Sequence, residues 1–455
     1  MVGNAFRSLF CCLFVATSAC LGPSVEKDGC QVDFVETVPE GMNIEPPHGL
    51  NPVATHESWK EMIDSAKESI KIASMYWYLT AENGFAHHSS AQPGKQVMEA
   101  IRRAVGRGVK LDVVLSTHTR SMNNDQEVES LEKLGRVSRV NMTRLLGAGI
   151  LHSKVMIIDD ESFYVGSANF DWRALAHVKE TGLTFKHCPR LGADVVKIFK
   201  TYKLVSGEGE LPRSANDEGL EALTNEESPT RVNIGGQQSD VYVTSSPPYL
   251  NKGTGRTNDI DAVLQFITEA QQNIDISVMN YSPRQDYARP KVYWPVIDDA
   301  LRAAATTRKV RVRLLFGLWR GTRASEIAWY KSLNSLQSPD FGPGGIEVRL
   351  YLVPALDEFQ KSIPFARVKH DKYMVTEKSL FVSNNNWTPD YFINTAGVSL
   401  AITPRPSQDE AEQSPSIVRD FANIFERDWR SDYSMSVEEG EKYWLENFDR
   451  SGKKV

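Results

Sequence analysis

The chain has 455 residues, of which 41% are apolar and 24% are charged, an ordinary composition for a globular protein. Its length is sufficient for two substantial hydrophobic cores. The formal net charge of −6 excludes a broad basic surface for coating duplex nucleic acid, although it leaves room for a local cationic pocket.

The N-terminus carries a short apolar run, SLFCCLFVATSACLG, which is followed by Pro23. It is shorter than the roughly 20 residues of a membrane span, and it ends in small residues suited to signal cleavage. We interpret residues 1–20 as a secretory signal peptide, with an uncleaved short anchor as the alternative. The chain is then expected in the secretory pathway, lysosomal or secreted, with no obligate membrane span.

Cysteine usage fits an oxidising compartment. Cys11 and Cys12 leave with the signal and Cys20 lies at the expected cut, so the mature chain keeps Cys30 and Cys188. We predict a disulfide between these two, and two buried free thiols are the alternative.

Three glycosylation sequons occur, at Asn141, Asn280 and Asn386. Asn141 lies beside a polar stretch and is the predicted acceptor. The other two follow or lie within apolar strands and motifs, so we expect them to be buried.

Helices and strands alternate along the first half of the chain, which indicates an α/β sandwich. The periodicity predicts helices at 55–69, 95–108 and 193–205, and strands at 70–79, 109–116 and 182–185, with two further strands within 151–169.

The segment 206–239 is acidic, rich in Gly, Ser and Pro and without periodicity, so it is predicted to be a linker or exposed loop. The order of elements then repeats. The sequence predicts helices at 259–273, 293–307 and 416–429, and strands at 274–281, 309–317 and 397–402, with the stretch 369–387 in the place of 151–169.

This internal duplication is the strongest organisational feature of the sequence. We expect a first half at 30–205, a second half at 240–435 and a C-terminal tail at 436–455. The two halves are predicted to be related by a pseudo-twofold axis.

The stretch LHSKVMIIDDESFYVGSAN holds His152 and Lys154 inside a predicted strand, where a period of two places them on one face. One such pair is usually a solvated face. Here it recurs as His370 and Lys372. The first copy continues with Asp159, Ser167 and Asn169, and the second with Glu377, Ser383, Asn384 and Asn386. Two copies at matching places of a duplicated fold favour an active site between the halves.

Two histidines and two lysines that face each other suit phosphodiester cleavage without a metal or other cofactor. The lysines and nearby hydroxyl or amide donors would hold the phosphoryl oxygens. One neutral imidazole would attack phosphorus to give a phosphohistidine, and the other, protonated, would donate to the leaving oxygen.

These motifs resemble the phospholipase D superfamily, whose HxKxxxxD and GSxN pattern is present twice. The stretches VGSANFDWRAL, VKETG, GRTNDIDA, HDKYMVTE and NNWTPDYF are similar to the group of phospholipase D family members three and four, over residues 30–435. The resemblance implies a duplicated phospholipase D-like α/β/α sandwich. It also implies a lysosomal 5′ exonuclease of single-stranded DNA and RNA that forms a homodimer.

The resemblance also suggests roles for single residues. It makes His152, Lys154, His370 and Lys372 catalytic and gives Ser167, Asn169 and Asn386 to phosphate binding or support. Asn384 departs from the family pattern, but its amide can still donate to a phosphate oxygen. Asp159 and Glu377 are expected to brace turns. Glu180 matches the carboxylate that orients the motif histidine, and the second half offers Thr395 instead, so His152 is favoured as the nucleophile and His370 as the acid, with exchanged roles as the alternative.

Some features leave alternatives open. Ser383 and Asn384 replace the glycine and the hydroxyl residue of the family pattern, which puts the pocket geometry in question. Arg367 and Lys369 either extend the cationic pocket or lie at a solvated edge. Six aromatic residues near the motifs either stack bases or pack the core: Tyr76, Trp77, Tyr78, Trp172, Trp387 and Tyr391.

The sequence therefore predicts a metal-independent phosphodiesterase, with exonuclease action on single-stranded nucleic acid as the leading interpretation. A phospholipase D or transphosphatidylase acting on glycerophospholipids would use the same four catalytic residues. A degenerate lumenal binding protein is the third alternative, suggested by Asn384.

Overall fold

The computed structural model describes residues 24–26, 29–406 and 416–448. The predicted signal peptide lies outside the described residues. None of the described helices is both long and apolar enough to cross a membrane.

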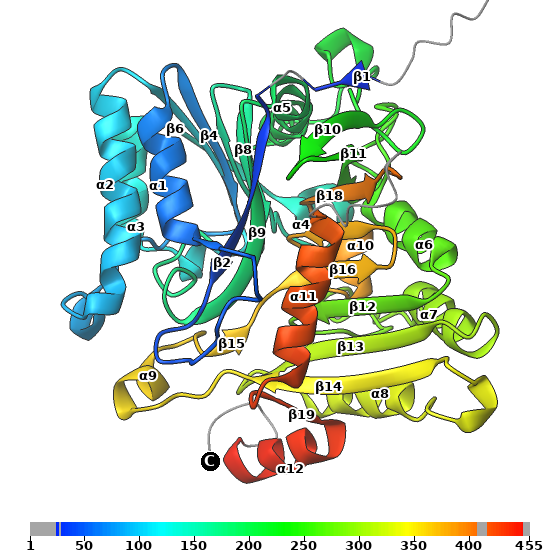
Figure 1. Cartoon of the computed structure of the whole chain (residues 1–455). Helices are drawn as coiled ribbons and strands as arrows, with labels where there is room; N and C mark the ends of the chain where they lie inside the picture. The colour runs from blue at the N-terminus through cyan, green and yellow to red at the C-terminus, as the bar shows by residue number, and fades with distance from the viewer. Residues whose placement is uncertain (1–23, 27–28, 407–415, 449–455) are drawn as a thin grey trace, which may run out of the picture.

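Two large sheets with the same strand order build the molecule (Figure 1). In the first half the seven repeated strands run in the order β2 (Gln31–Thr37), β9 (Val178–Lys186), β8 (Ser162–Gly166), β7 (Lys154–Ile158), β4 (Ser69–Ser74), β5 (Lys110–Ser116) and β6 (Arg136–Val140). In the second half they run in the order β11 (Gln237–Ser246), β18 (Gly397–Pro404), β17 (Leu380–Ser383), β16 (Lys372–Thr376), β12 (Asn273–Val278), β13 (Arg311–Leu318) and β14 (Gly345–Leu352). The parallel and antiparallel pairings also agree pair by pair, so the predicted duplication is confirmed.

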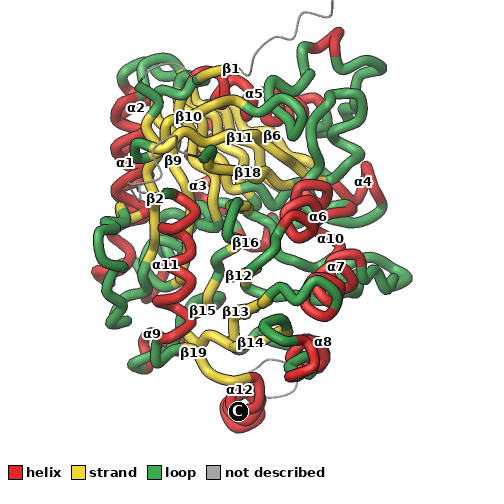
Figure 2. Tube along the Cα trace, turned by 45° about the vertical axis from the view of Figure 1, so that its right-hand side comes forward, coloured by secondary structure: helices red, strands yellow, loops and turns green. Residues whose placement is uncertain are grey.

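Helices cover both outer faces and fill the space between the sheets. The outer layer of the first half holds α1 (Thr55–Ser65), α2 (Gln92–Gly106) and α3 (Asp125–Leu134), and that of the second half holds α6 (Asp259–Glu269), α7 (Val296–Thr306) and α8 (Ala324–Asn334). Figure 2 shows α1 and α2 on one side of the molecule and α6, α7 and α8 on the other. Between the sheets lie α5 (Pro189–Leu204) and α11 (Ile417–Arg430), whose apolar residues pack against strands of both halves in one central core. The α/β sandwich with two related halves is therefore confirmed.

Short elements complete the fold. They are β1 (Ser24–Val25), β3 (Val53–Ala54), β10 (Thr230–Ile234), β15 (Val368–Lys369) and β19 (Ser434–Ser436), with α4 (Met142–Leu146), α9 (Glu358–Ser362), α10 (Pro389–Ile393) and α12 (Val437–Asn447).

The motif strands are buried on both faces because helices cover each sheet on both sides. Every residue of β7 and β8 is buried, which explains their continuous apolar sequence in place of a polar and apolar alternation. The helix α2 ends as expected, since Gly108 just beyond it takes a φ of +94°, a conformation that favours glycine.

The segment 206–239 is not only a linker. It contains β10 and the start of β11, which form a hairpin around Gly235 and Gly236, and both glycines have the positive φ that a two-residue turn requires. In β10 buried Val232 and Ile234 alternate with exposed Asn233, a short pattern that the polar composition of the segment concealed.

The predicted tail also carries structure. Residues 437–447 form α12, which begins with a capping box between Ser436 and Glu439 and buries Trp444. The strand expected at 70–79 ends at Ser74, so Tyr76, Trp77 and Tyr78 lie beyond it.

The Cys30–Cys188 disulfide is present and joins the leading end of β2 to the start of α5. Of the sequons, Asn386 is buried, as expected. Asn280 is half-buried rather than buried, and its amide donates a 2.9 Å hydrogen bond to Glu326. Asn141 is half-buried and caps α4 through its side-chain oxygen.

Candidate active site

The two motifs meet at a cavity of about 370 Å³ between the halves, which we call the histidine cavity. Its lining includes His152, Asn169 and Glu180 from the first half and His370 and Asn386 from the second. The structure therefore brings the predicted histidines and asparagines together. The motif lysines Lys154 and Lys372 are not among the lining residues, and neither are Ser167, Asn384, Asp159 and Glu377.

Each motif histidine is fixed by the main chain of the other half. The amide of His152 donates to the carbonyl of Ala396 at 2.8 Å, and the amide of His370 donates to the carbonyl of Lys179 at the same distance. Both histidines lie just before their strands, rather than inside them as expected, because these inter-half hydrogen bonds replace the ladder of their own sheets. Each half therefore fixes the main chain of the motif histidine in the other half.

The motif lysines are buried behind the histidines. Lys154 donates to the carbonyl of His152 at 2.6 Å, and Lys372 donates to that of His370 at 2.5 Å. Neither ammonium forms an ion pair within the described part of the chain. Burial holds the pKa of Lys154 well below its usual value, with Lys372 adding to the effect, and burial lowers the pKa of Lys372 to about 7. A bound anion would offset this unfavourable burial of positive charge, so the site suits a phosphate group.

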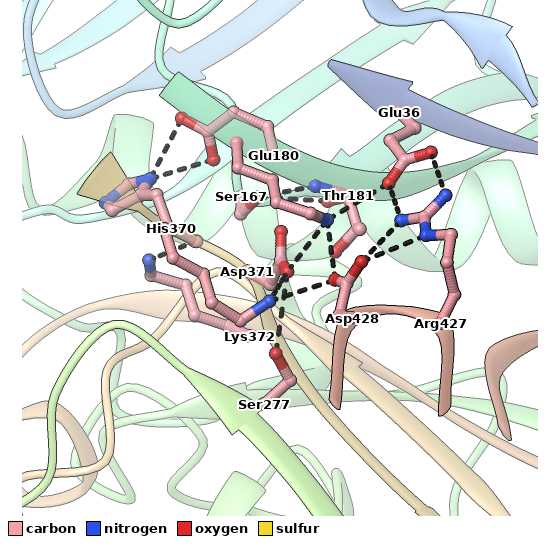
Figure 3. Close-up of polar contacts among 12 residues, drawn as sticks. Glu36, Ser167, Glu180, Thr181, Ser277, His370, Asp371, Lys372, Arg427 and Asp428 are labelled. Carbon is pink, nitrogen blue, oxygen red and sulfur yellow. Dashed lines mark hydrogen bonds and ion pairs between the residues drawn. The ribbon is translucent and has the colours of Figure 1, made fainter. Parts of the chain in front are cut away.

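Glu180 contacts His370, not His152 as the sequence suggested. Its two carboxyl oxygens lie 2.8 and 3.0 Å from Nδ1 of His370 (Figure 3). Burial raises the pKa of Glu180 to about 8, although Lys372 opposes that shift. With Nδ1–H donating to Glu180, the lone pair on Nε2 of His370 is free for chemistry.

The repeat explains this correction. Lys179 and Ala396 accept the equivalent amide bonds, so the residue equivalent to Glu180 is the next one, Gly397, and not Thr395. A Cβ at Gly397 would lie only 2.2 Å from the side-chain nitrogen of Asn385, so that side chain fills the space. No carboxylate stands at the equivalent position behind His152.

His152 has no carboxylate of the described chain against its ring, unlike His370. Its Nδ1 is buried without a hydrogen-bond partner among the described residues, and its ring packs edge-on against Tyr391 at 4.9 Å. Burial holds the pKa of His152 well below its usual value, and Lys154 and Lys372 lower it further. The same causes, with burial the largest, lower the pKa of His370.

Asn384 takes over the structural contact of Ser167. The hydroxyl of Ser167 accepts the amide of Thr181 at 2.9 Å, and the side-chain oxygen of Asn384 accepts the equivalent amide of Val398 at 2.9 Å. Asn384 departs from the family pattern, but it preserves the hydrogen bond that joins the end of β17 to β18.

Ser383 is accommodated by a second difference between the halves. At Gly166 a Cβ would lie 2.4 Å from the hydroxyl of Tyr164, whereas the residue equivalent to Tyr164 is Phe381, which has no hydroxyl. The Tyr164 hydroxyl accepts the amide of Ala168 at 3.2 Å, and the Ser383 hydroxyl accepts the equivalent amide of Asn385 at 3.0 Å. The same buried donor is satisfied in both halves.

The motif acids brace turns, as expected. Asp159 accepts three main-chain amides from residues 67–69, each at 2.8 Å. Glu377 accepts three from residues 271–273, at 2.8 to 3.3 Å. Asp159 therefore fixes the segment that leads into β4, and Glu377 fixes the segment that leads into β12.

Sequence reasoning missed a buried charge cluster behind His370 (Figure 3). Lys179 lies 2.8 Å from Asp428 and 3.0 Å from Glu36, and Lys369 contacts Asp371 and Asp428. All of these side chains are buried, and Arg427 also joins Glu36 and Asp428. The available signal was a charged pair, Lys179 and Glu180, within the apolar strand β9. Lys369 thus belongs to this cluster and not to a solvated edge.

Two of the aromatic candidates reach the histidine cavity, namely Tyr76 and Tyr391. Trp77, Trp172 and Trp387 are core residues with at most 2% exposure. Two cationic residues that the sequence did not single out also line the cavity, and both are paired: Arg173 with Asp171, and Arg323 with Glu326 and Asp286.

Within the described ranges no cluster of three or more His, Cys, Asp or Glu residues could hold a metal ion.

Known proteins resemble this chain in sequence and fold. A family model described as the PLD3/4, PLD-like domain matches residues 50–355. The protein named 5′-3′ exonuclease PLD3 from Xenopus laevis is 38% identical over 90% of this chain and 81% of its own length, and the human 5′-3′ exonuclease PLD4 is 34% identical over 91% and 80%. The crystal structure of a phosphatidylserine synthase from Haemophilus influenzae shares the fold, with a TM-score of 0.58 at 11% identity over 93% of this chain and 94% of that one.

Proposed function

Because the chain belongs to the PLD-like family of PLD3 and PLD4, we propose that it is a phosphodiesterase that removes nucleotides from the 5′ end of single-stranded nucleic acid. The observation that carries the proposal is the meeting of two motif histidines, one from each half, at one cavity, each with its motif lysine buried behind it. The nucleic-acid preference comes from the names of the relatives.

We assign the nucleophile to His370. The argument that favoured His152 depended on a carboxylate behind it, and Glu180 contacts His370 instead. Nε2 of His370 would attack phosphorus while the bond to the leaving oxygen breaks, and His152 would give its Nε2 proton to that oxygen. Water would then cleave the phosphohistidine, with His152 taking the proton and His370 released unchanged.

The phosphoryl oxygens would be held by Lys154 and Lys372, with Asn169 and Asn386 at the cavity wall. Two buried ammonium groups without ion pairs stabilise negative charge more strongly than exposed lysines, since the low local dielectric strengthens each contact. The charge that grows on the phosphoryl oxygens during attack is stabilised in the same way.

The proposed compartment is an acidic lumen of the secretory pathway, lysosomal or extracellular. The Cys30–Cys188 disulfide supports an oxidising route, and glycosylation at the half-buried Asn141 would accompany it. Homodimer formation is proposed from the family resemblance alone.

Release of mononucleotides from 5′-hydroxyl single-stranded DNA at about pH 5 tests the function, since a lower pH favours the protonated imidazole that the proposed mechanism requires. We expect wild-type protein to release them in the presence of EDTA, and His152→Ala and His370→Ala each to abolish release. Glu99→Gln is the control, because Glu99 lies on the exposed face of α2 and outside the histidine cavity, and it should keep full release.

Three outcomes separate the alternatives. Nucleotide release that depends on both histidines supports the exonuclease. Turnover of phosphatidylcholine vesicles without nucleotide release would show a lipid phosphodiesterase. Folded protein without either activity would show a binding protein and overturn the proposal.

A further inference from the structure

A second cavity, of about 600 Å³, adjoins the histidine cavity. Trp319, Gly321 and Phe365 line both cavities, so the two are direct neighbours. The second cavity extends from the end of β13, along residues 352–367, to α12 and Phe448. A chain held by its phosphate at the histidines would enter it directly.

The second cavity is lined by positive charge, although the protein as a whole is acidic. Arg320, Lys361 and Arg367 line it, and no Asp or Glu is among its described lining residues, whereas the chain carries a net charge of −6. Lys361 pairs with Glu358, but Arg320 and Arg367 form no ion pair within the described residues.

These two arginines are instead held by main-chain oxygens. Arg320 donates to the carbonyl of Ile363 at 2.7 Å, and Arg367 donates to those of Pro354 at 2.9 Å and Glu40 at 3.0 Å. In the histidine cavity, by contrast, Arg173 and Arg323 are neutralised by carboxylates. Fixed guanidinium groups without a counter-charge are suited to phosphate.

Aromatic side chains stand at the junction of the two cavities. Phe365 is 57% exposed and takes a φ of +56°, which a phenylalanine rarely adopts. Trp319 is half-buried and also lines both cavities. An exposed aromatic ring in a strained conformation, next to arginines, is the arrangement that stacks unpaired bases while phosphates contact the cations.

We propose that the second cavity binds the part of a single-stranded nucleic acid on the 3′ side of the scissile phosphate. The inference rests on the proposed function. An enzyme that starts at a 5′ end keeps one nucleotide on one side of the reacting phosphate and the whole remaining strand on the other. The larger, adjoining cavity with cations and aromatic rings fits that remaining strand.

The test compares two substrates that share the nucleotide on the 5′ side of the scissile bond and differ in the leaving group, in Arg320→Ala and Phe365→Ala proteins. Oligothymidylate of about 12 nucleotides can occupy the second cavity, whereas thymidine 3′-(4-nitrophenyl phosphate) has no strand on its 3′ side. We expect each variant to lose about tenfold in kcat/KM on the oligonucleotide, the loss of one stacked base or phosphate contact. Turnover of the nitrophenyl ester by the Arg320→Ala protein should change less than about twofold, because Arg320 lines only the second cavity and uniform binding of the remote strand is what is lost.

Salt dependence gives a second readout. Arg320→Ala should reduce the slope of log(kcat/KM) against log[salt] on the oligonucleotide by about 0.7, the value for one phosphate contact of a single strand. Arg102→Ala, on the exposed face of α2 and outside both cavity linings, is the matched control.

The outcomes distinguish this inference from the proposed function. If wild-type protein cleaves both substrates and Arg320→Ala loses equally on both or on neither, the second cavity does not hold the strand. If wild-type protein cleaves neither, the proposed function itself fails. Loss on phosphatidylcholine vesicles, with the oligonucleotide unaffected, would assign the cavity to lipid.

Discussion

The contact between Glu180 and His370 makes the two catalytic histidines unequal. A histidine that attacks phosphorus becomes positively charged, and a carboxyl group on Nδ1 stabilises that charge and fixes the reactive tautomer. His152 lacks such a group, and its buried ring fits an acid that must give up its proton readily.

Glu180→Gln tests this division of roles. The amide keeps an oxygen that can accept Nδ1–H but cannot ionise to a carboxylate when His370 becomes positively charged, so we expect kcat to fall about 10- to 100-fold with little change in KM. Mass spectrometry of an acid-quenched single turnover should find phosphate on the peptide that contains His370. Phosphate on the His152 peptide would contradict the assignment.

The pKa values of the site predict an acidic activity profile. Burial lowers the pKa of the proposed acid His152, so its protonated fraction falls as pH rises through the acidic range. Burial also lowers the pKa of Lys372 to about 7, so its positive charge is lost as pH rises past neutrality. Both deprotonations lower activity as pH rises. The ratio kcat/KM reports them, because it depends on the pKa values of the free enzyme.

We therefore expect kcat/KM on single-stranded DNA to fall steadily from about pH 5 to about pH 8. The measurement is a pH series at constant ionic strength. A maximum at or above about pH 8 would show that neither His152 nor Lys372 controls activity as proposed.

Position 383 shows how two halves of one fold satisfy the same buried donor with different residues. Phe381→Tyr would direct a hydroxyl into the space of the Ser383 side chain, because the equivalent Tyr164 hydroxyl occupies the place of a Cβ at Gly166. We expect this variant to lose about 1–3 kcal/mol of unfolding free energy through overpacking.

Adding Ser383→Gly should restore part of the loss, since the new hydroxyl could then accept the Asn385 amide as Tyr164 accepts that of Ala168. Urea denaturation of the single and double variants measures both effects. A double variant less stable than Phe381→Tyr alone would refute the compensation.

At the scale of single elements, β9 connects more of the site than any sequence pattern indicated. It pairs with β2 and β8 of its own sheet and with β15 of the other half. It supplies Glu180 to the cavity and Lys179 to the buried charge cluster, whose other members come from β2, β15 and α11 and from Asp371. This cluster holds the segment that carries His370.

Lys179→Met tests the cluster by leaving buried carboxylates without their main cation. We expect it to lower the unfolding free energy by about 3–5 kcal/mol, the cost of breaking a buried ion pair from one side. Lys186→Met on the same strand is the matched control, because Lys186 pairs with Asp33 and Glu61 at a partly exposed edge and should cost about 1 kcal/mol or less. Equal losses of unfolding free energy in the two variants would show that the buried cluster stabilises the fold no more than the partly exposed ion pairs of Lys186.

For the whole molecule, repetition made the fold and the four catalytic residues predictable. Two copies of one element order indicated the sandwich, and two HxK motifs identified the site. Contacts between the halves were not predictable, because nothing in either copy alone shows that β9 pairs with β15 or that Glu180 crosses to His370. The hairpin at Gly235 was missed for a local reason, since two glycines in a polar segment indicate a loop before their strands are known.

The contacts between the two halves predict one complete active site in each chain. His152 and His370 of a single chain line one cavity, and each is anchored by the other half of that chain. Mixing His152→Ala protein with His370→Ala protein should therefore restore no activity, even if two chains associate. The assay compares the mixture, including a sample refolded together, with each variant alone on 5′-hydroxyl single-stranded DNA. Recovery of activity in the mixture would mean that histidines from different chains can form one site, and the cavity within a single chain would not be the catalytic unit.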